Sequence, residues 1–173
     1  SRISMRFSDR LSTLNPTHPT MSDGPYLFDV GVIALAHSQA PVADAALSYV
    51  RQAVAGEINA VVPTTAVIGA HNVLTTHYDI SNRRASELMQ NFTSAQRIDW
   101  YGDLSHEVVS AGFSLAAEHN IDGWDGYYAT VARETGVETL LTIDDDFESI
   151  PEFETAIILS PEQFATLNDY LGY

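Results

Sequence analysis

The sequence lacks both cysteine and lysine, and it contains no long hydrophobic run. Without cysteine there is no disulfide, no zinc–thiolate site and no cysteine nucleophile. The longest wholly apolar run, residues 30–36, is much too short to span a bilayer. No positively charged start followed by an apolar stretch indicates a secretory signal. We therefore expect a soluble, cytoplasmic protein that does not enter a membrane.

Positive charge is also scarce. Eight basic residues, all of them Arg, face 23 acidic residues, and the formal net charge is −15. This balance argues against binding nucleic acid or an anionic membrane through bulk positive potential. A surface rich in acids and poor in lysine is typical of proteins from salt-loving archaea, where the Debye length falls to roughly 3 Å or less. We favour a halophilic origin, which makes an individual surface Asp weak support for a functional site.

The length and composition fit one domain with one sizeable core. The chain has 173 residues, of which 45% are hydrophobic. Residues 1–24 show no sustained periodicity and are expected to form a flexible leader, in which Met21 is a candidate natural start. Residues 25–173 are expected to form the single domain.

Short apolar segments alternate with helical patterns along that domain. Strands are predicted at residues 26–30, 60–63, 97–100, 138–143 and 156–159, with helices in all but the last interval between them and one more at the C-terminus. Strands that are apolar on both faces and separated by helices favour a mainly parallel sheet covered on each side. The predicted fold class is α/β, with three α/β/α layers and a central sheet of about five strands.

Acidic residues stand where the carboxyl ends of these strands should meet. In open parallel sheets, sites form beyond those ends. Three chain segments bring carboxylates to this edge, through Asp29, through Asp122 and Asp125, and through Asp144, Asp145 and Asp146. Clustered carboxylates raise each other's pKa unless a cation compensates their charge. A few hard oxygen ligands suit Mg²⁺ or Mn²⁺.

Each of these acids also has a purely structural interpretation. A purely structural role is least favoured for Asp29, because an unpaired charge inside an apolar strand is costly to bury. Asp122 is favoured as a helix cap over a metal ligand. Asp125 fits equally well as a ligand or as a negative charge at the positive end of a helix dipole. At least one of the acids at 144–146 is expected to be a solvated turn residue.

Taken together, three motifs resemble those of the PIN-domain ribonucleases, including the toxins of VapC type. The resemblance covers about residues 26–160. It rests on Leu27-Phe28-Asp29 at the start of the domain, on Trp124-Asp125-Gly126-Tyr127-Tyr128-Ala129 within a helix, and on Leu141-Thr142-Ile143-Asp144-Asp145-Asp146-Phe147. The last pattern, in which acids and a phenylalanine end a strand, is the most specific.

This resemblance implies a Mg²⁺- or Mn²⁺-dependent endoribonuclease. Asp29, Asp125 and Asp144, often assisted by Asp146, would hold one or two divalent ions, and a metal-activated water would hydrolyse RNA phosphodiesters. Thr142 would hydrogen-bond a carboxylate ligand or a water. The implied partners are an RNA substrate, a small antitoxin protein and a second copy of the chain in a homodimer.

The chain departs from the family pattern at two places. Members usually carry a Glu on the helix after the second strand, and that position falls near Gly69 or Ala70. The adjacent His71 is a possible substitute, although a structural role is favoured for it. Val30-Gly31 replaces the usual Thr/Ser-Asn. These departures leave open a second hypothesis, a PIN-fold binding or scaffold module with weakened or lost catalysis.

Two further interpretations are weaker. A phosphatase on a related sheet is disfavoured, because no second Asp follows two residues after Asp29. Trp124, Tyr127 and Tyr128 could stack on bases, but packing in the core or at its rim is favoured at their helical spacing.

Overall fold

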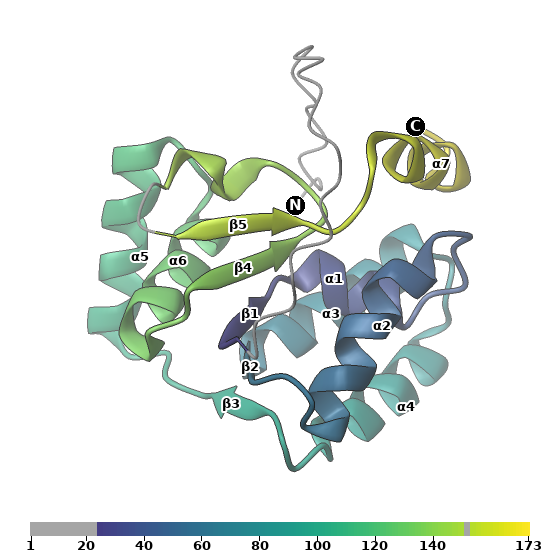
Figure 1. Cartoon of the computed structure of the whole chain (residues 1–173), viewed down its shortest axis with the longest axis horizontal. Coiled ribbons are helices and arrows are strands. Elements are labelled where there is room, and N and C mark those ends of the chain that lie inside the picture. The colour runs from purple at the N-terminus through teal and green to yellow at the C-terminus, as the bar shows by residue number, and fades with distance from the viewer. Residues whose placement is uncertain (1–23, 151–152) are drawn as a thin grey trace.

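A five-stranded parallel sheet forms the centre of the molecule (Figure 1). The computed structural model describes residues 24–150 and 153–173, without the side chains of Asp146 and Ser149. The strand order is β3-β2-β1-β4-β5. The strands are β1 (Tyr26–Phe28), β2 (Ala60–Pro63), β3 (Asp99–Tyr101), β4 (Thr139–Thr142) and β5 (Glu154–Ile157). The predicted α/β class and parallel sheet are confirmed, whereas the predicted leader, apart from Gly24, lies outside the described residues.

The helices follow the predicted order. They are α1 (Val30–Ala36), α2 (Ala43–Ala55), α3 (Thr64–His77), α4 (Asn82–Thr93), α5 (His106–His119), α6 (Gly123–Thr135) and α7 (Pro161–Leu171), with a 3-10 helix η1 (Asp146–Ser149). None of the helices within residues 24–150 and 153–173 is both long and apolar enough to cross a membrane.

The sequence placed the last strand two residues too late. The apolar run at 156–159 drew the prediction toward the C-terminus, but β5 begins at Glu154, which pairs with Thr139 of β4. An edge strand tolerates an exposed Glu because only one side of it is hydrogen-bonded within the sheet. A second small difference is at Asp29, which follows β1 and caps α1 instead of ending the strand.

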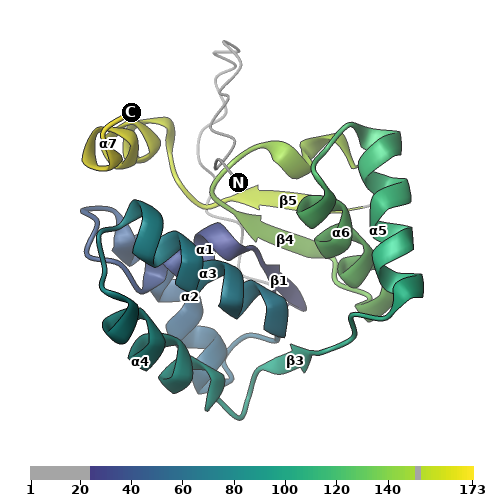
Figure 2. The same ribbon diagram turned by 180° about the vertical axis from the view of Figure 1, so that it is seen from behind.

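The path of the chain sets the two helical layers. From β1 it moves outward to β2 and β3, and it then returns past β1 to reach β4. Because parallel crossovers are right-handed, the outward and return connections lie on opposite faces of the sheet. Figures 1 and 2 show α1–α4 on one side of the molecule and α5 with α6 on the other. The connecting helices therefore change from one face of the sheet to the other between β1 and β4, and a site is expected at this point.

Buried strands form the middle of the core. Leu27, Phe28, Leu140 and Leu141 are fully buried, as expected for central parallel strands that are covered on both faces. Burying each such side chain stabilises the folded state by about 1.5–3 kcal/mol. The adjacent strands β1 and β4 thus lie in the middle of the core.

Two glycines allow α5 and α6 to pack closely. A Cβ atom added at Gly126 would lie 2.1 Å from the carbonyl oxygen of Gly112. One added at Gly112 would lie 2.9 Å from the backbone of Tyr127. Any larger residue would push the helices apart, so these glycines fix the position of α6 and of Asp125 at its first turn.

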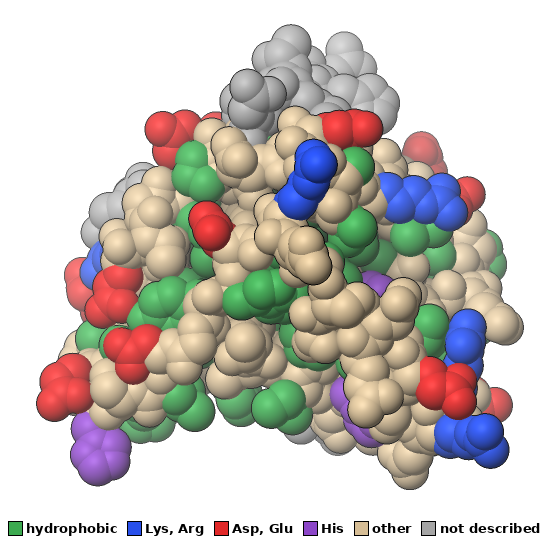
Figure 3. Space-filling view, turned by 90° about the horizontal axis from the view of Figure 1, so that it is seen from below, with side chains coloured by type: hydrophobic (Ala, Val, Ile, Leu, Met, Phe, Trp, Pro, Cys, Tyr) green, Lys and Arg blue, Asp and Glu red, His purple; other side chains and the backbone are tan. Residues whose placement is uncertain are grey.

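Acidic side chains are spread over the surface. On the face drawn in Figure 3 they stand at several separate places and do not form a single patch. Only two Asp or Glu residues with described side chains are buried, Asp29 and Asp144, each 8% exposed. Burial therefore separates these two acids from the rest of the acidic surface.

His37 ends α1 and is largely enclosed. Its Nδ1 lies 2.8 Å from the carbonyl oxygen of Ile33, and its ring centroid lies 5.1 Å from that of Phe92. Burial lowers the pKa of His37 below the ordinary value of 6.5, although the contact with Ile33 acts in the opposite direction. The unfolded chain then takes up a proton near pH 6.5 while the folded chain resists it, so stability is lost as the pH falls below that value.

We predict that His37 makes the protein acid-sensitive well above the range in which carboxylates titrate. The urea midpoint of the wild type should fall between about pH 7.5 and 5.5, and His37→Gln should flatten this fall. His106→Gln, at an exposed position on α5, is the matched control and should keep the wild-type profile. An unchanged profile in His37→Gln would contradict the assignment.

Candidate active site

The pairing of β1 with β4 brings Asp29 and Asp144 together. The register places Phe28 opposite Leu141, and the backbone N–H of Asp29 donates to the carbonyl oxygen of Leu141 at 3.1 Å. Asp29 therefore follows the end of one central strand, and Asp144 follows shortly after the end of its neighbour. Both lie at the carboxyl edge of the sheet, as the sequence predicts.

The hydroxyl of Thr142 lies between the two carboxylates. Thr142 is the last residue of β4 and is fully buried. Its Oγ1 donates to Asp29 Oδ2 at 3.1 Å, lies 3.5 Å from Asp144 Oδ1, and accepts a hydrogen bond from the Asp144 backbone N–H at 3.3 Å. The predicted contact between Thr142 and a site carboxylate is confirmed, and it fixes the orientation of Asp29.

Asp29 also has a structural role. Its Oδ1 accepts a hydrogen bond from the backbone N–H of Val30 at 2.7 Å and so caps α1. The two oxygens of this carboxylate thus receive different donors, one from the backbone and one from Thr142. Hydrogen bonds of this kind favour the charged form of a buried carboxylate.

Asp122 is the cap of α6, whereas the role of Asp125 as a metal ligand stays a prediction. Asp122 Oδ1 accepts a hydrogen bond from the backbone N–H of Asp125 at 2.9 Å, which confirms Asp122 as the cap of α6. Asp125 is half-buried in the first turn. Burial raises the pKa of Tyr128, and the charges of Asp29 and Asp125 raise it further. Both carboxylates therefore act electrostatically on the Tyr128 hydroxyl.

The remaining acids contribute less to the observed geometry. Asp145 precedes η1 and makes no capping hydrogen bond with its side chain, and the side chain of Asp146 lies outside the described part of the structure. Among the described residues, no group of three or more His, Asp or Glu side chains is arranged to hold a metal ion. Metal binding by Asp29, Asp125, Asp144 and Asp146 stays a prediction.

The donors present nevertheless fit one kind of ion. Asp29 and Asp144 supply buried carboxylate oxygens, Thr142 supplies a hydroxyl between them, and Asp125 lies near Tyr128. Mg²⁺ is commonly bound through one or two carboxylates and keeps several waters, and Mn²⁺ accepts the same oxygen ligands. The site therefore suits an ion that keeps several waters better than an ion that must be enclosed by protein ligands.

The two departures from the PIN pattern lie in contact with each other. A Cβ atom added at Gly69 would lie 3.0 Å from Val30 Cγ2 and 3.3 Å from its Cγ1. Val30 therefore packs against the point where a side chain at Gly69 would begin. His71 contacts the neighbouring helix, because its Nε2 lies 3.0 Å from the Ser86 hydroxyl on α4. This contact supports the structural interpretation of His71.

The aromatic residues of α6 pack at the core and its rim, as predicted. Tyr127 and Tyr128 are buried, and the Tyr127 hydroxyl donates to the carbonyl oxygen of Asp103 at 2.9 Å. Trp124 is 53% exposed, and its ring stacks on that of Tyr128 with centroids 6.2 Å apart. The sequence reasoning missed the hydroxyl of Thr65 on α3, which interacts with both tyrosines, because nothing in the local pattern marks a contact between α3 and α6.

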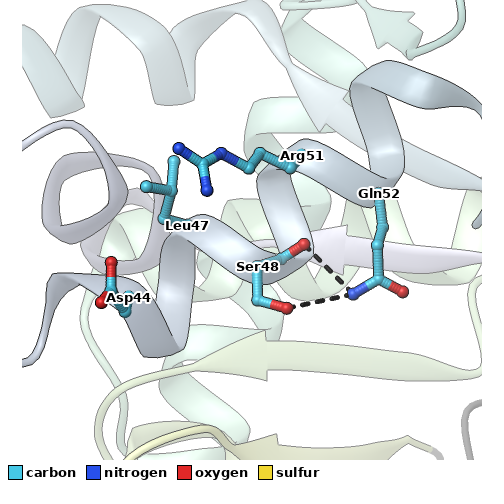
Figure 4. A pocket seen from close by; sticks show the side chains of 5 residues that line it. All are labelled: Asp44, Leu47, Ser48, Arg51 and Gln52. Carbon is cyan, nitrogen blue, oxygen red and sulfur yellow. Dashed lines mark hydrogen bonds between the residues drawn. The ribbon is translucent and has the colours of Figure 1, made fainter.

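A surface pocket lies elsewhere, on α2 (Figure 4). It is lined by Asp44, Leu47, Ser48, Arg51 and Gln52, and the Gln52 amide donates to the carbonyl oxygen and the hydroxyl of Ser48 at 3.1 and 3.2 Å. These five side chains include one carboxylate and one guanidinium, both exposed. The buried carboxylates at the sheet edge are the stronger candidate.

We predict that Thr142 stabilises the site through its hydroxyl. Thr142→Val keeps the shape of the side chain but removes the donor to Asp29 and the acceptor for the Asp144 N–H. The free energy of unfolding should fall by about 1.5–3 kcal/mol because a buried charged group loses a hydrogen bond. Urea unfolding in metal-free buffer measures this change. Thr142→Ser keeps the hydroxyl and should lose less, so equal losses in both variants would refute this role.

Comparison with known proteins shows which solved structures share this fold. No protein-family model matches the chain, and no curated protein matches it in sequence. Similar solved structures include a toxin–antitoxin complex from Klebsiella pneumoniae, with 15% identity and a TM-score of 0.55 over 78% of this chain and 98% of that chain.

Two others are VapBC2 from Rickettsia felis bound to a DNA fragment from its promoter, and FitAcB from Neisseria gonorrhoeae. The first has 15% identity and a TM-score of 0.57 over 76% of this chain and 96% of that chain. The second has 16% identity and a TM-score of 0.51 over 75% and 95%. The chain therefore has the PIN-like three-layer α/β/α fold of these toxin–antitoxin structures.

Proposed function

We propose that the chain is a PIN-type endoribonuclease that hydrolyses RNA phosphodiesters with the help of Mg²⁺ or Mn²⁺. The observation that supports this most is the pair of buried carboxylates, Asp29 and Asp144, joined through Thr142 at the carboxyl edge of the sheet. Two buried like charges repel each other, and a cation bound between them would offset this repulsion. A site of this kind suits a polyanionic substrate, because the cation supplies the positive charge that the acidic surface lacks.

Each residue has a role in this proposal. Asp29 and Asp144, with Asp125 and Asp146, would hold the ion. When bound, such an ion lowers the pKa of a coordinated water and offsets the negative charge of a phosphodiester. Thr142 keeps Asp29 in one orientation, and the capping bond from Val30 holds its other oxygen. The close packing of α5 on α6 fixes Asp125 relative to the sheet.

We propose further that a small antitoxin protein restrains this activity. Support comes from the structural neighbours, which are toxin–antitoxin complexes, one of them bound to DNA. A homodimer also stays a prediction. A small DNA-binding protein encoded beside this chain would be the candidate antitoxin, and it should suppress RNA cleavage when it is added in equal amount.

A binding or scaffold module is the second candidate function. It is favoured by the absence of an acid at Gly69 and Ala70 and by the packing of Val30 against the point where a side chain at Gly69 would begin. Such a module would keep the fold and bind RNA or protein without cutting. Whether the chain cleaves RNA or only binds it decides between the two functions.

We predict metal-dependent RNA cleavage that requires the buried carboxylates. In high-KCl buffer with Mn²⁺, the wild type should cleave single-stranded RNA, and EDTA should abolish the cleavage. Asp29→Asn and Asp144→Asn should each lower the rate by about 100-fold, as expected when a metal-site residue is lost. Asp44→Asn changes an exposed acid on α2 and should keep full activity. RNA binding without metal-dependent cleavage would instead support the binding module.

We also propose that the acidic surface is adapted to concentrated salt. The net charge of −15 and the spread of acids over the surface support this. Raising KCl from about 0.1 M to 1 M shortens the Debye length from about 10 Å to 3 Å and screens the repulsion. The urea midpoint should therefore rise with KCl, mostly within this range. A midpoint that stays constant or falls would contradict the adaptation.

A further inference from the structure

Two buried hydroxyls at the carboxyl edge of the sheet lack hydrogen-bond partners among the described residues. They are Thr65 Oγ1, in the first turn of α3, and the Tyr128 hydroxyl on α6. Thr65 approaches Tyr128 closely enough to lower its pKa, but the contact falls short of hydrogen-bond geometry. Buried polar atoms in native proteins almost always have a partner, and the exceptions point to a water, an ion or a ligand.

Both hydroxyls belong to the carboxyl edge of the sheet. Thr65 follows β2 by two residues, and Tyr128 lies one turn beyond Asp125. Burial raises the pKa of Tyr128, and Asp29 and Asp125 raise it further through their charges. The charges of two of the proposed metal ligands therefore act on the Tyr128 hydroxyl, which comes from a different helical layer than Thr65 does.

The next turn of α3 carries no polar side chain at the two positions near which the family pattern has its acid. Gly69 has no side chain, and Val30 packs against the place where one would begin. Ala70 is apolar and fully buried. In this part of α3, Thr65 supplies a buried oxygen.

We infer that Thr65 and Tyr128 are positioning residues that bind a water from the hydration shell of the divalent ion. This inference rests on the proposed function and identifies how that site holds an ion with few carboxylates. A water can donate to one hydroxyl and accept from the other, which satisfies both at once. Mg²⁺ and Mn²⁺ keep several waters in such sites, and groups that bind those waters orient the ion.

The competing interpretation is that the two hydroxyls bind a phosphate oxygen of the RNA instead. Both interpretations require an oxygen ligand, but they differ in what supplies it. A hydration water makes metal binding depend on the hydroxyls when no RNA is present. A phosphate oxygen makes only RNA binding depend on them.

The test uses Tyr128→Phe and Thr65→Val, which remove each hydroxyl and keep its shape. Mn²⁺ binding without RNA is measured by electron paramagnetic resonance of the free ion in high-KCl buffer. Each variant should bind Mn²⁺ about 10-fold more weakly, as expected for a group that acts through a metal-bound water. The double variant should lose little more than either single one, because one water is lost in each case. Thr130→Val removes a buried hydroxyl of the same helix that already donates to the carbonyl oxygen of Gly126 at 3.0 Å, and it should keep the wild-type affinity.

A second readout does not depend on metal. In metal-free buffer, Tyr128→Phe should melt at the same temperature as the wild type or higher, because it removes an unpaired buried hydroxyl. Tyr127→Phe should melt lower, because it leaves the carbonyl of Asp103 without its donor. A lower melting temperature for Tyr128→Phe would show a structural partner and overturn the inference.

The outcomes separate this inference from the proposed function. Full Mn²⁺ affinity in both hydroxyl variants, with binding abolished in Asp29→Asn, would overturn the hydroxyl pair alone and leave the metal site standing. Weaker RNA binding with unchanged Mn²⁺ affinity would likewise overturn it in favour of the phosphate contact. A wild type that binds no Mn²⁺ at all would overturn the metal site and the inference together.

Discussion

The candidate site depends on one structural feature, the parallel pairing of β1 with β4. The chain lays down β1, β2 and β3 in one direction and then crosses back, so that β4 joins the sheet on the free side of β1. The connections before and after this point lie on opposite faces, which opens the edge of the sheet there. Asp29 and Thr142 meet because Phe28 is opposite Leu141 in this register. A one-residue slip would turn these side chains to the other face and separate them.

The same pairing explains how a charged residue is held beside the centre of the core. Asp29 follows three fully or almost fully buried residues, yet both of its oxygens receive donors, one from Val30 and one from Thr142. Without them, burying this carboxylate would cost far more. Thr142 in turn contacts Asp144. The stability of the strand ends and the geometry of the proposed metal ligands therefore depend on the same few hydrogen bonds.

Local patterns were enough to predict most of the fold. Apolar runs such as residues 60–62 mark the strands, and the cap Asp122 marks where a helix begins. The edge at which Asp29 and Asp144 meet also follows from sequence, because all parallel strands end on the same side. The start of β5 was missed since its first residue, Glu154, is fixed by pairing with Thr139 and not by its own hydrophobicity.

Contacts between distant segments could not be predicted in this way. The missing acid near Gly69 or Ala70 and the unusual Val30 appear as two separate departures in the sequence, yet Gly69 and Val30 are in contact in the structure. The hydroxyls of Thr65 and Tyr128 are 63 positions apart and belong to opposite helical layers. Neither residue is unusual in its own segment, so only the folded structure shows that Thr65 lies beside Tyr128.

The acidic composition takes on a different meaning once burial is known. Bulk salt screens exposed charges, but it screens a buried pair much less. Of the described acids, Asp29 and Asp144 are the buried ones. Concentrated salt therefore screens the repulsion between exposed carboxylates but leaves the repulsion between these two almost unchanged. That repulsion must be met locally, by the donors at Val30 and Thr142 and, in the function we propose, by a bound cation. The two acids that salt adaptation explains least are therefore the two on which the proposed chemistry rests.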